Sequence, residues 1–265
     1  MDMSENLKVP TMAGLMAEGK QPEVLFWVGC AGSFDDRAKK ITKAFVKILN
    51  KINIDFAVLG TEESCTGDPA KRAGNEFLFQ MQAATNIEVL NGYDVKKIVT
   101  TCPHCFNTIK NEYPALGGNY DVVHHTQFLK QLLDEGKLKI EGGEFKGKRI
   151  TYHDPCYLGR ANGEYEAPRE LLRKLDVELV EMKSCKSRGL CCGAGGAQMF
   201  KDAEPGNKEV NIHRTEEALE TQPEAIAAGC PFCNTMMTDG VKNKDKQDSI
   251  KVYDVVEMLS DAVDL

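Results

Sequence analysis

The sequence has no long apolar segment, no excess of basic residues and no beginning that resembles a secretory signal peptide. No apolar run approaches the ~20 residues that a membrane-spanning helix needs, so we expect no transmembrane segment of its own. The net charge of −7 is spread over both halves of the chain. Because nucleic-acid binding relies on clustered Lys and Arg, we expect no nucleic-acid partner.

Two sequence fingerprints of bound cofactors are also missing. The glycine-rich run at 193–196 is not a dinucleotide-binding loop, because Gln198 stands where the third glycine should be and Cys192, not a strand, precedes the run. The C-x₂-C-x₂-C-x₃-C run of a ferredoxin is absent as well. We therefore expect a flavin or a ferredoxin-type centre to come from partner chains.

Cysteine, in contrast, is abundant, with ten in 265 residues. In an extracellular chain this number would indicate disulfides. Without a signal peptide we expect a reducing cytoplasm, in which metal-bound thiolates are the better interpretation. Soft thiolates select zinc, copper(I) or iron–sulfur clusters over magnesium and calcium.

Half of the cysteines form one motif in the second half of the chain, made of a single Cys, a Cys-Cys-Gly run and a Cys-x₂-Cys pair: Cys156, Cys191, Cys192, Cys230 and Cys233. Five thiols cannot pair without a remainder, and they exceed what a mononuclear zinc site needs. The motif therefore predicts an iron–sulfur site. Zinc and a simple dithiol are the alternatives. The dithiol is considered because each Cys-x₂-Cys pair opens a predicted helix, whose N-terminus would lower the pKa of a thiol.

The same motif occurs earlier with one position changed: Cys30, Cys65, Cys102 and Cys105. Cys30 and Cys65 precede their counterparts by 126 positions, and the Cys-x₂-Cys pair by 128. Thr66 stands in place of Cys192 and cannot supply a soft thiolate. The chain is thus an internal duplication of roughly 120 residues per copy. The four remaining thiols predict a second iron–sulfur cluster or a zinc site, with an empty or purely redox-active site as a further alternative.

Strand and helix patterns alternate through both copies. In the first copy strands are predicted at 24–28, 56–59, 98–100 and 121–123, with helices at 37–52, from Pro69 to about 90, behind Cys105 and at 126–134. In the second copy strands are predicted at 149–153, 177–182, 225–229 and 250–253, with helices at 167–175, 208–219, behind Cys233 and after 253. This alternation predicts an α/β fold of two tandem Rossmann-like domains with parallel sheets, related by pseudo-twofold symmetry.

The repeat divides the chain into an N-terminal arm at 1–21, a first domain at 22–134, a linker at 135–148 rich in Gly, Lys and Glu, and a second domain at 149–265. The apolar residues of the arm are expected to pack on its own domain, with a partner as the alternative. Every motif cysteine follows the carboxyl end of a predicted strand, where parallel sheets place their ligands. The thiols of one copy should therefore converge.

Other residues carry weaker signals. Cys185 lies outside the repeat and is expected to be a plain, half-buried thiol. His104, inside the first Cys-x₂-Cys pair, either hydrogen-bonds a sulfur or faces solvent. His124 and His125 end a strand and should face opposite sides, in the core or on the surface, with a proton relay as the alternative.

The motif segments resemble the paired cysteine-rich CCG domains of the heterodisulfide reductases and of the glycolate oxidase and lactate-utilisation iron–sulfur proteins. Residues 152–160 and 191–196 carry the likeness, and residues 65–69 resemble the branch associated with electron-transferring flavoprotein. The resemblance covers about residues 22–262. It also suggests that His153 and Asp154 contact and orient the ligands of the second site. The alternative is that they are ordinary turn residues.

The resemblance implies that the complete five-cysteine set holds a noncubane 4Fe–4S cluster. It implies an iron–sulfur electron-transfer subunit of an oxidoreductase complex, passing electrons between a flavoprotein or ferredoxin donor and a quinone, thiol or organic-acid couple. Such a subunit would be cytoplasmic, or peripheral to the membrane through a quinone-linked partner. The alternatives are a zinc-binding or redox-sensing scaffold and a heterodisulfide reductase-type catalytic subunit. In the latter family two noncubane clusters face each other, so Thr66 favours the relay.

Overall fold

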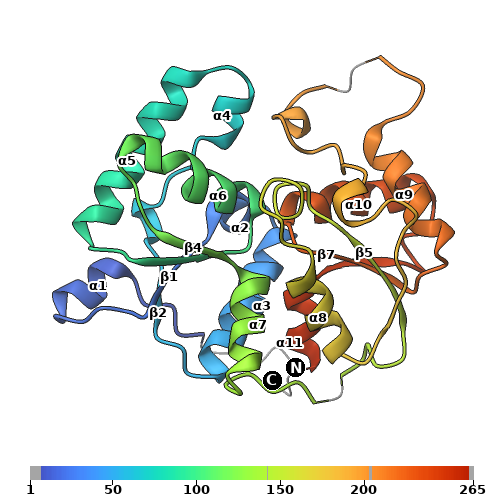
Figure 1. Cartoon of the computed structure of the whole chain (residues 1–265), viewed down its shortest axis with the longest axis horizontal. Helices are drawn as coiled ribbons and strands as arrows, with labels where there is room; N and C mark the ends of the chain where they lie inside the picture. The colour runs from blue at the N-terminus through green and yellow to red at the C-terminus, as the bar shows by residue number, and fades with distance from the viewer. Residues whose placement is uncertain (1–6, 142, 203–204, 263–265) are drawn as a thin grey trace.

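The computed structural model describes residues 7–141, 143–202 and 205–262, which form two parallel four-stranded sheets (Figure 1). The first sheet has the order β2-β1-β3-β4, with β1 Val24–Trp27, β2 Phe56–Ala57, β3 Lys97–Thr100 and β4 Asp121–His124. The second has the order β6-β5-β7-β8, with β5 Arg149–His153, β6 Glu178–Leu179, β7 Ala225–Ala228 and β8 Lys251–Asp254. The identical order confirms the predicted duplicated α/β fold.

Helices connect the strands and cover the sheets. The first copy contains α1 Met12–Ala17, α2 Gly29–Phe34, α3 Ala38–Lys51, α4 Asp68–Arg72, α5 Glu76–Gly92, α6 Pro103–Asn107 and α7 His125–Asp134. The second contains α8 Glu166–Lys174, α9 Val210–Glu220, α10 Pro231–Asn243 and α11 Val255–Ala262. Within the described part of the chain, no helix is both long enough and apolar enough to cross a membrane.

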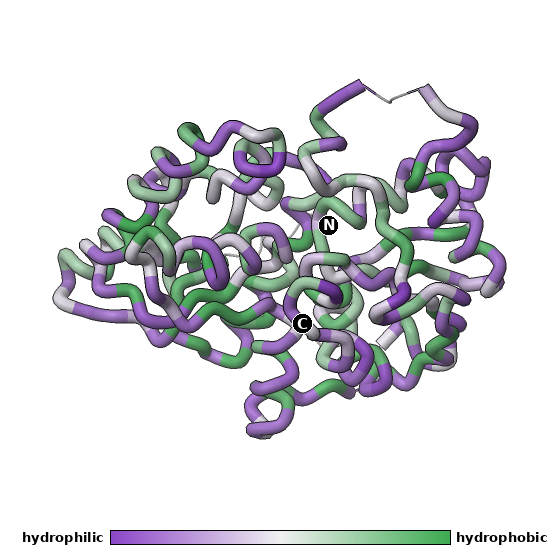
Figure 2. The backbone as a smooth tube through the Cα atoms, turned by 45° about the horizontal axis from the view of Figure 1, so that its top comes forward, coloured by the Kyte–Doolittle hydropathy of each residue, from purple (hydrophilic) through white to green (hydrophobic). Residues whose placement is uncertain are grey.

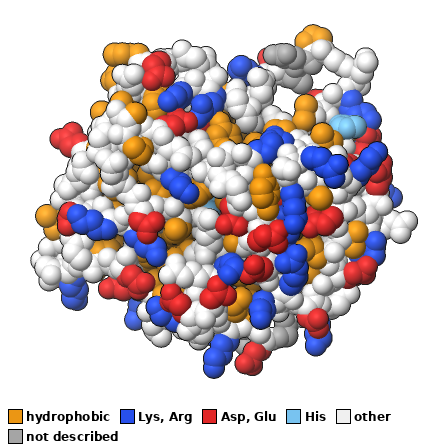
Figure 3. Space-filling model, viewed as in Figure 1, with side chains coloured by type: hydrophobic (Ala, Val, Ile, Leu, Met, Phe, Trp, Pro, Cys, Tyr) orange, Lys and Arg blue, Asp and Glu red, His pale blue; other side chains and the backbone are white. Residues whose placement is uncertain are grey.

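The strands form because short apolar runs are buried on both faces of each sheet, as parallel sheets require. All four residues of β1 and of β7 are buried. Figure 2 shows these hydrophobic strands inside the molecule, with hydrophilic segments around them. On the face shown in Figure 3, acidic and basic side chains are interspersed rather than segregated.

A single hydrophobic core joins the two copies. Helices α3 and α7 of the first copy pack against α11 and α8 of the second, in the lower centre of Figure 1. The core contains Phe45 and Phe128 from the first copy and Leu171 and Leu259 from the second. Residues 135–148, expected to be a linker, also contribute buried side chains to this core. The two sheets are therefore held in one arrangement by burial of apolar surface.

Two polar contacts reinforce this junction. The Arg37 guanidinium donates to both carboxylate oxygens of Glu257, at 2.7 Å each, and to the Val252 carbonyl at 2.8 Å. His125 Nε2 lies 2.9 Å from Asp254 Oδ1, and both side chains are fully buried. Each contact pairs one copy with the other, so the junction carries specific hydrogen bonds as well as apolar packing.

The expectation that His124 and His125 face opposite sides is wrong. Their ring centroids are 4.3 Å apart, and both rings are fully buried. The strand ends at His124 and α7 begins at His125. The alternation of side chains along a strand therefore does not extend across this pair.

The predicted helix from Pro69 to about residue 90 is divided in two. Helix α4 ends at Arg72, and Gly74 then adopts a left-handed φ of +85° that other residues rarely adopt. The Asn75 side chain accepts a hydrogen bond from the Leu78 amide and starts α5 as its N-cap. A second difference lies at the sheet edges, where β2 and β6 are only two residues long, shorter than predicted.

The N-terminal arm packs on its own copy, as expected. Thr11 forms a parallel bridge with Val58, and the Met12 amide donates to the Val58 carbonyl at 2.9 Å. The Met12 side chain is buried in the core beside β1. Residues 1–6 of the predicted arm lie outside the described residues.

We predict that Arg37→Met destabilises the junction between the copies. Glu257 is largely buried and would lose both of its charged hydrogen bonds, which should cost about 1–3 kcal/mol of folding free energy. The matched control is Lys39→Met, because Lys39 pairs with a 95% exposed Asp36 and should cost less than about 0.5 kcal/mol. Thermal or urea unfolding of both variants measures the difference, and equal midpoints would contradict the prediction.

Candidate metal centres

The motif cysteines follow the carboxyl ends of parallel strands in both copies, as predicted. Cys30, Cys65 and Cys102 follow β1, β2 and β3, and Cys156, Cys191 and Cys230 follow β5, β6 and β7. Because the carboxyl ends of parallel strands meet at one edge of a sheet, the three loops of each copy come together there. All ten cysteines are free thiols.

In the second copy the structure brings the five predicted thiols into one connected group. The Sγ atoms of Cys192 and Cys233 are 3.3 Å apart. Cys191 interacts with both Cys156 and Cys192, and Cys230 interacts with Cys233. Cys192, Cys230 and Cys233 are buried, whereas Cys156 and Cys191 are half-buried at the rim. We call this set the second thiol group.

In the first copy the four predicted thiols also converge, and we call them the first thiol group. Cys30 interacts with Cys65, and Cys102 interacts with Cys105. The two pairs are close enough for the charge of Cys102 to act on Cys30. Thr66, at the position of Cys192, is as deeply buried as that cysteine.

The thiol groups fit a soft, positively charged centre. Hydrogen bonding to a neighbouring thiol and burial raise the pKa of Cys30, of Cys156 and of Cys233. Packed this closely, the thiols cannot all ionise against one another's charge. A bound cation removes that obstacle, because thiolates are the ligands of zinc and of iron–sulfur clusters.

Two equivalent glycines place backbone N–H groups on the sulfurs. Gly67 has φ +88° and donates to Cys65 Sγ at 3.5 Å, and Gly193 has φ +90° and donates to Cys191 Sγ at 3.3 Å. A Cβ on Gly67 would lie 2.8 Å from the Phe79 ring. Only glycine therefore fits this turn, and the turn directs its N–H at the thiol.

The Cys-x₂-Cys pairs open helices, as predicted. Cys102 is the N-cap of α6, and Cys230 is the N-cap of α10. Cys230 Sγ accepts a hydrogen bond from the Cys233 amide at 3.5 Å. The N-terminus of the 13-residue α10 thus directs a backbone N–H at a thiol sulfur.

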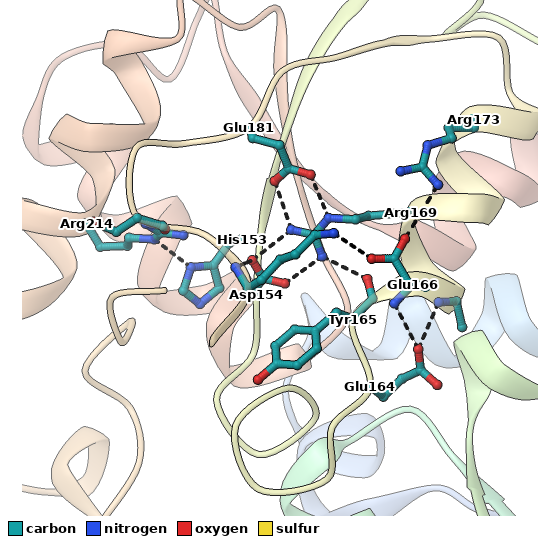
Figure 4. A network of polar contacts seen from close by, with 12 residues as sticks. His153, Asp154, Glu164, Tyr165, Glu166, Arg169, Arg173, Glu181 and Arg214 are labelled. Atoms are coloured by element: carbon teal, nitrogen blue, oxygen red, sulfur yellow. Dashed lines mark hydrogen bonds and ion pairs between the residues drawn. The ribbon is translucent and has the colours of Figure 1, made fainter. Parts of the chain in front are cut away.

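A fully buried arginine holds the loops of the second thiol group (Figure 4). Arg169 donates two hydrogen bonds to Asp154, at 2.7 and 2.9 Å, and two to Glu181, at 2.6 and 2.8 Å. Asp154 Oδ2 also accepts from the Lys186 amide at 2.7 Å. Asp154 thus ties the loop of Cys156 to the segment before Cys191. The sequence analysis suggested Asp154 but missed Arg169, because nothing distinguishes it from other helical arginines.

In the first copy a half-buried carboxylate from the loop of the second cysteine likewise joins two cysteine loops. Glu63 lies two residues before Cys65 and accepts hydrogen bonds from the amides of Val28, at 2.9 Å, and Gly29, at 2.6 Å. These amides begin the turn that carries Cys30. Burial raises the pKa of Glu63 to about 7, although both N–H groups act to lower it. Each copy therefore uses one carboxylate to join its first two cysteine loops.

His104 connects the two thiol groups and does not face solvent. Its Nδ1 lies 2.9 Å from Asp68 Oδ2, and its ring lies 4.5 Å from the Tyr157 ring and 5.2 Å from the Phe232 ring. Burial acts to lower the pKa of His104, but the bond to Asp68 and the nearby thiolates raise it to about 9. Residues adjacent to the first thiol group thus contact residues adjacent to the second.

Two further predicted residues lie near the second thiol group. A ring nitrogen of His153 lies within 4.8 Å of the Sγ atoms of Cys192 and Cys233, which supports its suggested role. Cys185 is half-buried, and burial raises its pKa. The charged groups that act on Cys185 are carboxylates and basic side chains rather than other cysteines. It therefore stands apart from the five motif thiols.

Comparison with known proteins agrees with this geometry. The family model described as "Cysteine-rich domain" (CCG) matches residues 24–110 and 150–238, one match in each copy. The chain is 47% identical over 99% of its length to the "Probable iron-sulfur-binding oxidoreductase FadF" of Bacillus subtilis. It is 46% identical over 97% of its length to the "EtfAB:quinone oxidoreductase" of Syntrophomonas wolfei.

The chain spans 37% of the length of each of these two relatives. It is also 35% identical, over 92% of its length, to one subunit of the "Dihydromethanophenazine:CoB--CoM heterodisulfide reductase" of Methanosarcina barkeri, of which it covers 59%. The matches of the family model contain both thiol groups. The chain therefore belongs to the CCG family of cysteine-rich domains and carries two copies of that domain.

Proposed function

We propose that this chain is the iron–sulfur electron-transfer part of an oxidoreductase, which relays electrons between a flavoprotein or ferredoxin donor and a quinone, thiol or organic-acid couple. The observation that carries the proposal is the convergence of nine free thiols into two groups at the carboxyl ends of two parallel sheets. The printed names of the relatives, an iron–sulfur-binding oxidoreductase and an EtfAB:quinone oxidoreductase, support the reaction class.

In this proposal the second thiol group holds a noncubane 4Fe–4S cluster, because it offers more thiols than tetrahedral zinc or an ordinary cluster needs. The first thiol group holds a second iron–sulfur cluster or zinc. A bound cluster supplies the uptake and release of one electron at a time. Thr66 leaves the first group without a fifth soft ligand, so the two centres differ.

The surrounding residues stabilise thiolate sulfur and hold the cysteine loops in place. The amides of Gly67 and Gly193 donate to thiol sulfur and favour its ionised form. The carboxylates of Glu63 and Asp154 lock neighbouring cysteine loops together. A fixed polar environment of this kind lowers the structural rearrangement that accompanies a change of charge.

A relay between the centres is favoured over symmetric cleavage of a disulfide. The ring of His104 packs against the rings of Tyr157 and Phe232. The charges of Cys102 and Cys230, one from each thiol group, act on it, which supports a packed route between the groups. The relative from Methanosarcina barkeri is named as part of a heterodisulfide reductase, which makes disulfide cleavage the second candidate. That reaction needs two comparable centres facing one substrate, and Thr66 makes the two groups unequal.

We further propose that activity requires a complex. The sequence holds neither a dinucleotide fingerprint nor a ferredoxin run, so the donor's flavin or ferredoxin centre belongs to other protein segments or chains. The relatives are much longer than this chain, which supports the same conclusion. A quinone-linked partner would hold the chain peripherally at the cytoplasmic side of a membrane.

We expect Cys192→Ser to lower the iron content or change the cluster type of the second centre. Serine keeps most of the side-chain volume but removes a soft ligand, and metal affinity should fall by at least about tenfold. Iron and acid-labile sulfide analysis with an absorption spectrum measures the effect. Cys185→Ser is the control and should leave the spectrum unchanged. Wild-type iron and spectra in both variants would remove Cys192 from the ligand set, and a colourless zinc protein would favour a scaffold.

The two centres should be distinguishable, because Thr66 replaces a thiol in the first. A redox titration followed by electron paramagnetic resonance should give two signals with separate midpoints, or one signal with zinc in the other site. Thr66→Cys adds the missing thiol at a buried position and should make the first signal more similar to the second. Two indistinguishable centres in the wild-type protein would contradict the asymmetry.

The relay predicts a restricted set of reactions for the anaerobically purified protein. With a reduced low-potential dye, turnover should require a quinone or flavoprotein couple and the native partners. Steady-state assays with and without partners provide the measurement, and coenzyme-type heterodisulfides serve as the competing substrates. Rapid heterodisulfide reduction by the chain alone would favour the disulfide-cleaving candidate.

A further inference from the structure

Trp27 and His153 occupy the same place in the two copies. Each ends the first strand of its sheet, three residues before the first motif cysteine. In the sheet register Trp27 pairs with Thr100, and His153 pairs with Ala228. Thr100 and Ala228 each stand two residues before a Cys-x₂-Cys pair. The equivalence is therefore structural as well as sequential.

Both side chains are completely buried, and each has a ring nitrogen without a hydrogen-bond partner among the described residues, Nε1 of Trp27 and Nε2 of His153. Trp27 packs in the same buried cluster as Cys102 and Cys105. His153 has a ring nitrogen within 4.8 Å of two sulfurs of the second thiol group. Trp27 thus shares a buried cluster with two thiols of the first group, and His153 lies near two sulfurs of the second.

The contacts of His153 determine which of its nitrogens carries the proton. Arg214 Nε donates to His153 Nδ1 at 3.0 Å. Arg214 is itself fixed by Glu217, at 2.6 Å, and by the Ser184 carbonyl, at 2.8 Å. A guanidinium can only donate, so Nδ1 must accept, and the proton of the neutral ring lies on Nε2. His153 therefore presents an N–H, not a free lone pair, on its unpartnered side.

Trp27 also presents an N–H on its unpartnered nitrogen, and no choice of tautomer is involved because an indole nitrogen can only donate. Both copies thus bury an N–H donor at an equivalent position. Buried donors in proteins are almost always paired, since an unmet donor is unfavourable. Sulfur atoms of a metal centre are acceptors of the right kind, and hydrogen bonds to them raise the reduction potential of iron–sulfur clusters.

We infer that Trp27 and His153 are equivalent positioning residues, each donating one N–H hydrogen bond to sulfur of the metal centre in its own copy and raising the reduction potential of that centre. The effect on potential rests on the proposed function, whereas the hydrogen bonds require only a thiolate-bound metal. Neither residue is a ligand. The two copies use different rings for the same task, which adds to the asymmetry introduced by Thr66.

The test uses three variants that separate donation from packing. Trp27→Phe keeps an aromatic ring and removes the N–H. His153→Asn keeps an oxygen where Nδ1 accepts from Arg214 but has no group at the Nε2 position. His153→Gln places an amide N–H near the Nε2 position. In redox titrations Trp27→Phe should lower only the potential of the first centre. His153→Asn should lower only that of the second, and His153→Gln should restore it.

A second measurement needs no variant, because Trp27 is the only tryptophan of the chain. Indole ¹⁵N labelling of the whole protein isolates this one N–H. Electron–nuclear double resonance of the reduced protein should show a ¹⁵N coupling and an exchangeable proton coupling at the first centre. Absence of both couplings would overturn the inference for Trp27 even if Trp27→Phe failed to fold.

The remaining outcomes also decide the question. Unchanged reduction potentials in Trp27→Phe and His153→Asn would overturn the inference. Loss of metal in both His153 variants would also overturn it, because His153 would then be a ligand or a purely structural residue. Zinc in the second site would defeat the proposed function, whereas zinc in the first is one of its two forms, and neither result removes the hydrogen bond. In either case cobalt(II) is substituted for zinc, and the sulfur-to-cobalt charge-transfer bands are recorded. These bands should shift in His153→Asn and return in His153→Gln, and Trp27→Phe should shift the bands of the first site. Unshifted bands would overturn the inference.

Discussion

Parallel strand pairing within each sheet is the constraint on which the rest of this structure depends. It brings the carboxyl ends of β1, β2 and β3 to one edge of the first sheet, and those of β5, β6 and β7 to one edge of the second. Thiols separated by 30 or more residues in sequence can share one small site only because these ends meet. The loops need not be long or flexible, so each can be stiffened by glycine turns and buried carboxylates without losing the convergence.

The shared core holds the two similar domains in one fixed arrangement. Because α3 and α7 bury apolar surface against α11 and α8, the sheets cannot turn independently, and the thiol groups keep a constant relation. His104 gains its partners Tyr157 and Phe232 from this arrangement. Rings contributed by cysteine loops of both copies therefore contact each other at His104. A relay needs this kind of fixed separation, since electron transfer depends on distance and on packed matter in between.

Duplication preserved the positions of the thiols while their surroundings diverged. The carboxylate that joins the first two loops comes from the second loop in one copy, as Glu63, and from the first loop in the other, as Asp154. Among the described residues the fully buried arginines, Arg169 and Arg214, both lie in the second copy, and Arg169 pairs with two carboxylates at once. The second site combines the doubly paired Arg169 with a fifth thiol, whereas the first combines the amide-bound Glu63 with the His104–Asp68 pair, so the two sites differ electrostatically. The same fold therefore places its thiols in two different electrostatic environments.

The sequence by itself determined the duplication, the α/β class and the thiol positions at strand ends, because spacing and hydrophobic periodicity are properties of the chain in one dimension. It did not determine where His104 and His125 point, that Arg169 supports a cysteine loop, or that the helix after Pro69 breaks at Gly74. These features depend on side-chain direction and on contacts between segments distant in sequence. Only tertiary packing decides which buried group faces which, and it gives different surroundings to two thiol groups that Thr66 already makes unequal.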